Sequence, residues 1–148
     1  MENEKKCVCL KILLDVNKER IWKALTDPSL TEKHMYNCQL HSSCEINSDA
    51  LWKQKNEDET FTTHEEAKVF EYSPYNKLRF LIFHNSDQYD IKESELNFTL
   101  EDQSTGVLLK IEQGNFPQTP EGKQLFEECL AGWNFVSEDL ITSIKELT

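Results

Sequence analysis

The chain has 148 residues, of which 38% are hydrophobic and 29% charged, a balance typical of a folded domain rather than of a disordered chain. Its 27 acidic and 16 basic residues give a formal net charge of -11. No basic stripe offsets that charge, so a nucleic-acid partner is not expected. No apolar run approaches the roughly 20 residues that span a bilayer. We therefore expect one domain, residues 1–148, with no membrane span.

The first residues and the five cysteines bear on the compartment of the protein. The start, MENEKKCVCL, mixes acidic residues with lysines and has no apolar stretch ending in small residues, so we expect no secretory signal. An odd number of cysteines in a chain without an export signal is most simply interpreted as reduced thiols. The sequence therefore predicts a cytoplasmic location.

The first predicted element is a strand over residues 7–16. Alternate residues in it are apolar and share one face, and this period of two indicates a half-buried strand. They are Val8, Leu10, Ile12, Leu14 and Val16. Asn17 can cap the helix that follows, ERIWKALTD. Asp27 and Pro28 then end this helix and begin a second, short one, which is predicted to reach about Met35.

Six strand-sized segments follow, separated by stretches with turn chemistry at residues 47–49, 73–76 and 85–87 among others. The segments are Gln39–Ile46, Ala50–Lys55, His64–Tyr72, Lys77–His84, Ser94–Glu101 and Thr105–Gln113. No helix-length segment lies between them, which disfavours parallel crossover units. The pattern therefore predicts an antiparallel meander.

A long helix is predicted from Thr119, its N-cap, through Pro120, its first residue, to the end of the chain, about 28 residues or roughly 40 Å. Its apolar residues fall on one side at about 100° per residue. They are Phe126, Cys129, Leu130, Trp133, Val136, Leu140, Ile144 and Leu147. Gly132 lies in mid-helix, although glycine there costs about 0.5–1 kcal/mol relative to alanine. Either Gly132 packs closely on a strand and Trp133 fills the core, or the helix bends there and leaves a cavity.

Four stretches of the chain together resemble one protein family. They are IWKALTDPSLTEKHM, KVFEYSPYNKLRF, ELNFTLEDQSTGVLLKIEQGNF and LAGWNFVSEDLITSIKEL. In this order they are similar to the START-like or SRPBCC superfamily, and within it to the family related to the C-terminal domain of activators of the heat-shock-protein-ninety ATPase. The resemblance implies an α+β helix-grip fold, in which a curved antiparallel sheet and two short N-terminal helices accompany a long C-terminal helix.

The sequence departs from this family at two places near the expected cavity. His34-Met35-Tyr36 stands where members often have a tryptophan, and Gln113 stands where many have a histidine. The ligand preferences of the family are therefore not carried over to this chain.

The resemblance implies a cavity between sheet and helix, and we expect it to bind a small hydrophobic or amphipathic molecule. The candidate ligand-binding residues are Trp52, Tyr72, Phe80, His84, Phe98, Gln113, Phe116, Phe126, Trp133 and Ser137. The aromatic members are equally compatible with an ordinary core. The hydroxyl of Ser137 is also able to bond to the preceding turn of its own helix.

Other chemistry has little support in the sequence. The histidines form no i, i+4 pair or HExxH motif, and Cys7-x-Cys9 lacks the C-x2-C spacing of structural zinc sites, so no metal is predicted. A G-x-S-x-G elbow and phosphate-binding glycine loops are missing, so we predict no catalytic residue and no cofactor. Adjacent carboxylates such as Glu65-Glu66 and Glu127-Glu128 are interpreted as solvated surface.

Two alternative functions stay open. A co-chaperone-like domain that docks a chaperone or another protein would use the acidic surface and Phe135, which is predicted to face outwards. A cyclase or aromatase type of enzyme, less favoured, requires an acid or base inside the cavity. The feature that separates ligand binding from protein interaction is whether the Trp133 side of the helix borders a void or a filled core.

Overall fold

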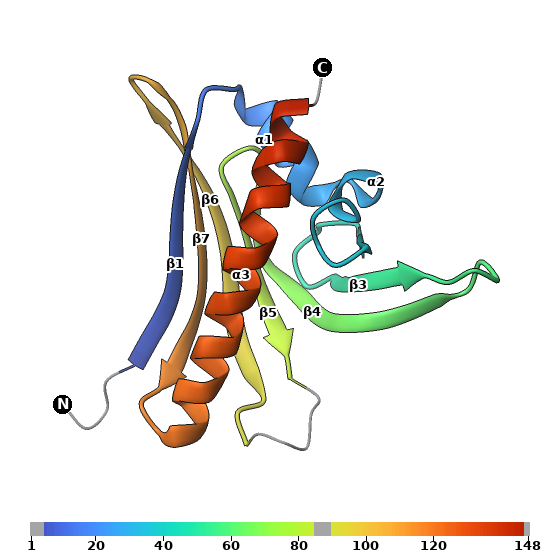
Figure 1. Cartoon of the computed structure of the whole chain (residues 1–148), viewed down its shortest axis with the longest axis vertical. Coiled ribbons are helices and arrows are strands. Elements are labelled where there is room, and N and C mark those ends of the chain that lie inside the picture. The colour runs from blue at the N-terminus through green and yellow to red at the C-terminus, as the bar shows by residue number, and fades with distance from the viewer. Residues whose placement is uncertain (1–4, 85–89, 147–148) are drawn as a thin grey trace.

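The computed structural model describes residues 5–84 and 90–146, and within them the chain forms seven strands and three helices (Figure 1). The strands are β1 (Lys5–Leu14), β2 (Cys38–Ser42), β3 (Asp49–Lys55), β4 (Phe61–Ser73), β5 (Lys77–Phe83), β6 (Glu93–Gln103) and β7 (Gly106–Pro117). The helices are α1 (Lys18–Thr26), α2 (Pro28–Thr31) and α3 (Pro120–Glu146). The predicted turn at residues 85–87 and Leu147 lie outside the described residues.

The strands form one antiparallel sheet in the order β1-β7-β6-β5-β4-β3-β2. Strands β2 to β7 follow one another as the predicted meander. β1 joins at the far edge, where Val8 lies opposite Gln113 and Leu14 lies opposite Val107 on β7. Helix α3 lies along one face of the sheet, and α1 and α2 lie near its C-terminal end (Figure 1). This arrangement confirms the predicted α+β helix-grip fold.

The ends of the helices follow from their caps. Asn17 accepts a hydrogen bond from the Arg20 amide at 2.9 Å, and Asp27 accepts one from the Ser29 amide at 2.9 Å. Helix α2 ends at Thr31 instead of reaching Met35. Residues 32–37 continue as turns, in which Tyr36 and Asn37 have φ values of 53° and 62° that no α-helix contains.

The core lies between the sheet and α3 and extends under the C-terminal half of that helix. Leu140 and Ile144 are fully buried there, against the inward side chains of the sheet. The predicted inner face of β1 is also confirmed, because Val8 and Leu14 are buried while Cys7 and Cys9 are exposed. No helix in the described part of the chain is both long and apolar enough to cross a membrane.

Candidate ligand-binding site

A cavity of about 490 Å³ lies between the sheet and the N-terminal half of α3. Its apolar wall consists of Met35, Trp52, Ile82, Leu96, Leu125, Trp133 and Val136. Gly132 also borders it. The helix therefore fills the core with one half and covers a cavity with the other.

The two tryptophans of the cavity are connected by a row of aromatic rings. Trp52 packs edge-on to Phe80 with 5.1 Å between ring centroids, and Phe80 packs on Phe98 at 5.9 Å. Phe98 in turn meets Trp133 at 6.0 Å and 87°. Edge-to-face packing of this kind is favourable and directional. Phe80 and Phe98 thus lie behind the wall and fix the orientation of the tryptophans in front of them.

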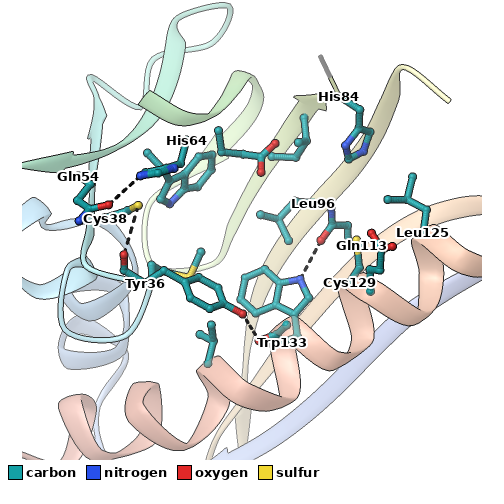
Figure 2. Close-up of a pocket in the computed structure, with 17 residues that line it drawn as sticks. Tyr36, Cys38, Gln54, His64, His84, Leu96, Gln113, Leu125, Cys129 and Trp133 are labelled. Carbon is teal, nitrogen blue, oxygen red and sulfur yellow. Dashed lines mark hydrogen bonds between the residues drawn. The ribbon is translucent and has the colours of Figure 1, made fainter. Parts of the chain in front are cut away.

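A chain of hydrogen bonds crosses from the helix to the end of β5. The Trp133 indole N–H donates to Gln113 Oε1 at 2.8 Å (Figure 2), and Gln113 Nε2 donates to Ser94 Oγ at 3.0 Å. Ser94 Oγ lies 2.9 Å from His84 Nε2. Because the indole can only donate, it fixes the orientation of the Gln113 amide. The arrangement allows the Ser94 hydroxyl to donate to His84 in the tautomer that carries its hydrogen on Nδ1.

Glu65 brings a carboxylate to the cavity from β4. It shares the inward face of that strand with Ala67 and Val69 and lies opposite Trp52 on β3. Burial, and then the charge of Glu66, raise the pKa of Glu65 to about 7. None of the hydrogen bonds of the described residues reaches this carboxylate to offset its burial. Its pKa near neutral makes it a group able to exchange a proton under ordinary conditions.

The interpretation of Glu65-Glu66 as solvated surface is wrong for Glu65. Glu66 is exposed, as predicted, but successive residues of a strand face opposite sides of the sheet, so its neighbour points inward. The sequence did indicate this orientation, because Glu65 is two and four residues before the apolar Ala67 and Val69, and residues at even spacing in a strand face the same side of the sheet.

The remaining polar lining comes from several elements. His64 Nε2 lies 2.8 Å from Gln54 Oε1, and the Tyr36 hydroxyl donates to the Gly132 carbonyl at 3.4 Å (Figure 2). Cys129, predicted as a core residue, borders the cavity, where burial and then Glu65 raise the pKa of its thiol to about 12. A thiol with that pKa is a poor nucleophile. Within the described residues, no three His, Cys, Asp or Glu side chains gather as metal ligands.

The structure brings some of the predicted site residues together and separates others. Trp52, His84, Gln113 and Trp133 line the cavity, with Phe80 and Phe98 behind them. The other four are not among the lining residues. Tyr72 packs near Trp22 with 5.9 Å between centroids, Phe116 and Phe126 pack together at 6.3 Å, and the Ser137 hydroxyl donates to the Asn134 carbonyl of its own helix at 2.9 Å.

A curved antiparallel sheet and a long C-terminal helix with a cavity between them define the START-like class of helix-grip proteins. The model of the family described as Activator of Hsp90 ATPase homolog 1-like protein matches residues 15–144. The chain belongs to this family, which confirms the resemblance found in its sequence. No curated protein matches the sequence.

Solved structures with the same fold come from several bacteria. Protein MLL2253 from Mesorhizobium loti is 20% identical with a TM-score of 0.76, and the match covers 97% of this chain and 99% of that one. CalU16 from Micromonospora echinospora is 15% identical with a TM-score of 0.72, over 97% of this chain and 78% of that one. The Aha1 dimer from Colwellia psychrerythraea is 16% identical with a TM-score of 0.73, and the match covers 95% of this chain and 97% of that one. At these identities the likeness concerns the fold alone.

Proposed function

We propose that the protein binds a small hydrophobic or amphipathic molecule in the cavity between the sheet and α3. The observation that carries the proposal is the void of about 490 Å³ beside Trp133, where a filled core would favour a protein-interaction domain instead. Mostly apolar walls with a few oriented polar groups are typical of small-molecule sites. Burial of the ligand's apolar surface would supply most of the affinity, at roughly 25 cal/mol per Å².

The residues proposed to contact the ligand follow from the lining. Trp52 and Trp133 supply apolar surface, while Gln113 and His84, which are linked through Ser94, supply polar groups. Glu65, which the sequence analysis did not select, is added to them. Because Gln113 is already bonded to both Trp133 and Ser94, its role is to hold the indole in place as much as to meet a ligand.

The proposal is tested with N-phenyl-1-naphthylamine, a probe that is neutral at pH 7 and fluoresces in apolar sites. We expect binding with about one-site stoichiometry and quenching of tryptophan emission by energy transfer. Cys129→Leu adds volume to the cavity wall and should weaken binding at least several-fold. Ser137→Leu, two turns further along the same helix and outside the lining, is the matched control and should bind as the wild type does.

The folding of both variants must be measured alongside probe binding. Circular dichroism and a denaturation midpoint for both variants separate loss of binding from loss of folding, since overpacking by itself costs about 1–3 kcal/mol. Absence of probe binding to the wild type, or equal binding by two folded variants, would contradict the cavity as the binding site.

A protein-interaction function is the second candidate, and one observation favours it. Phe135 and Tyr36 stack with 5.4 Å between ring centroids and 13° between ring planes, and their exposed fractions are 64% and 55%. Exposed aromatic pairs are common contacts in protein interfaces. Failure of the probe experiment would favour this function, in line with the co-chaperone-like alternative.

An enzyme of the cyclase or aromatase type requires an acid or base in the cavity, and Glu65 and His84 are such groups. Burial raises the pKa of Glu65 to about 7 and lowers the pKa of His84. The pKa of Glu65 lies in the range that suits proton transfer, whereas the lowered pKa of His84 favours its neutral imidazole. Binding is nevertheless the function that the cavity supports best, since it needs no reaction to be assigned.

A further inference from the structure

The described wall of the cavity carries acidic side chains but no lysine or arginine. The acidic side chains are those of Glu65 and Glu128. The basic groups on this wall are the imidazoles of His64 and His84, and burial lowers the pKa of His84, which favours its neutral form. A carboxylate or phosphate on a ligand would therefore enter a site of its own sign, where the described lining offers no lysine or arginine to pair with it.

Burial disfavours the negative charge of Glu65 in this wall. Its side chain projects from the inward face of β4, across from Trp52, and is partly buried. An ionised carboxylate in such a place is unfavourable unless a hydrogen-bond donor or a positive charge meets it. The described residues offer it no donor. A cationic donor on the ligand would meet this requirement.

The neighbouring aromatic surface favours the same kind of ligand group. Trp52 lies directly across the strands from Glu65, and Trp133 lines the same cavity. The face of an indole attracts an ammonium group within about 6 Å of its centroid, and tryptophan does so best of the aromatic residues. A carboxylate beside an indole is therefore better suited to an ammonium ion than to a neutral alcohol of the same size.

We propose that the cavity binds an amphipathic organic amine, with its ammonium group paired with the Glu65 carboxylate beside Trp52. The apolar part of the amine lies against Ile82, Leu96 and Trp133. This inference rests on the proposed function, and it adds the chemical class of the ligand. It excludes fatty acids and other apolar anions as the preferred occupants.

The pairing makes amine binding depend on pH. The titratable side chains around Glu65 are His64 and Glu66 on its own strand, Cys38 on β2, His84 at the end of β5, and Glu128 and Cys129 on α3. Burial raises the pKa of both thiols and so favours their neutral forms. As the pH rises from 6 to 8, Glu65 ionises, and affinity for a permanently protonated amine should increase.

Isothermal titration calorimetry with octylamine, octanol and octanoate compares three head groups on one apolar chain. Octylamine stays protonated in this range, as a lysine side chain does. At pH 8 we expect octylamine to bind the wild type at least about ten-fold more tightly than octanol, with octanoate weakest. Glu65→Gln should reduce the advantage of the amine to about three-fold or less while octanol affinity is retained. Glu66→Gln removes the same charge from the outer face and should keep the advantage.

The outcomes separate this inference from the proposed function. Binding of octanol without preference for octylamine, or a preference that survives in Glu65→Gln, overturns the amine inference and leaves ligand binding intact. Equal or tighter binding of octanoate also overturns it. Failure of all three ligands and of the naphthylamine probe overturns both. A pH dependence of octylamine binding that persists in Glu65→Gln would assign the effect to another of the named groups.

Discussion

Glu65 is expected to lower the stability of the fold in which it sits. Its pKa is about 7 in the folded protein, against an ordinary value of 4.5. Between these values the folded state holds a proton that the unfolded state has released, so stability falls as the pH rises from about 4.5 to 7. A group that destabilises the protein at working pH is typical of a functional position.

Glu65→Gln should therefore stabilise the protein at pH 8 and leave it nearly unchanged at pH 5, where the protonated carboxyl resembles the amide. With one pKa unit equal to about 1.4 kcal/mol, the gain at pH 8 is at most about 3 kcal/mol. Urea denaturation at the two pH values measures it. Glu66→Gln is the control, since that side chain is exposed. A variant less stable than the wild type at pH 8 would show that the ionised carboxylate is well accommodated.

The residues of the site were predictable from the sequence to different degrees. The inward position of Trp52 is predicted by its place in a strand, and that of Trp133 by its place on the apolar side of the helix. Glu65 could have been found by alternation along its strand, but because it is next to Glu66 in the sequence, both were interpreted as solvated surface. Ser94 could not be found, because its role depends on the distances between Gln113 and His84, which only the register of three neighbouring strands determines.

At the scale of elements, the two halves of α3 have different surroundings: one packs in the core and the other borders the cavity. Leu140 is fully buried between the helix and the sheet, whereas Gly132 borders the cavity. A Cβ added at Gly132 would meet the Tyr36 hydroxyl at 3.3 Å and no strand. The expectation that this glycine packs closely on a strand is therefore wrong. Its bare backbone leaves room for Tyr36 at the border of the cavity, and α3 continues through it as one helix.

Leu140→Ala should cost about 2–5 kcal/mol, because it removes apolar contacts and leaves a void in the packed half of α3. Phe135→Ala on the same helix is the control; its ring is 64% exposed and its loss should cost less than about 1.5 kcal/mol. Chemical denaturation of both variants gives the comparison. Equal midpoints for Leu140→Ala and the wild type would contradict the packing of this half of the helix.

The number and type of elements were largely predictable, and their ends were less so. The first strand was identified by alternation and the other six by their length and the turn residues between them, and the caps at Asn17, Asp27 and Thr119 marked three helix starts. The early end of α2 was missed because residues 32–37 form turns in place of a further helical turn, and these turns include positive φ at Tyr36 and Asn37, neither of which is glycine. Such conformations depend on surrounding contacts and leave no clear mark in the sequence.

For the whole molecule, the cysteines allow a direct test of the predicted reducing compartment. All five are free thiols in the structure, two of them exposed on β1 and two buried. Titration of the unfolded protein under non-reducing conditions should give five thiols per chain, and elemental analysis should give no stoichiometric zinc. A deficit of two thiols or one tightly bound zinc per chain would contradict the prediction.

The pairing of β1 with β7 also determines when the protein can become functional during its synthesis. β1 is the first strand of the sheet to be made, but its only partner in the described sheet, β7, is the last. Until then its apolar face has nothing to pack on, and joining the two ends costs loop-closure entropy. Trp133 on α3, which donates to Gln113 of β7, is made later still. The nascent chain can therefore build most of its meander first, while the cavity and its polar wall form only after β7 and α3 have been made.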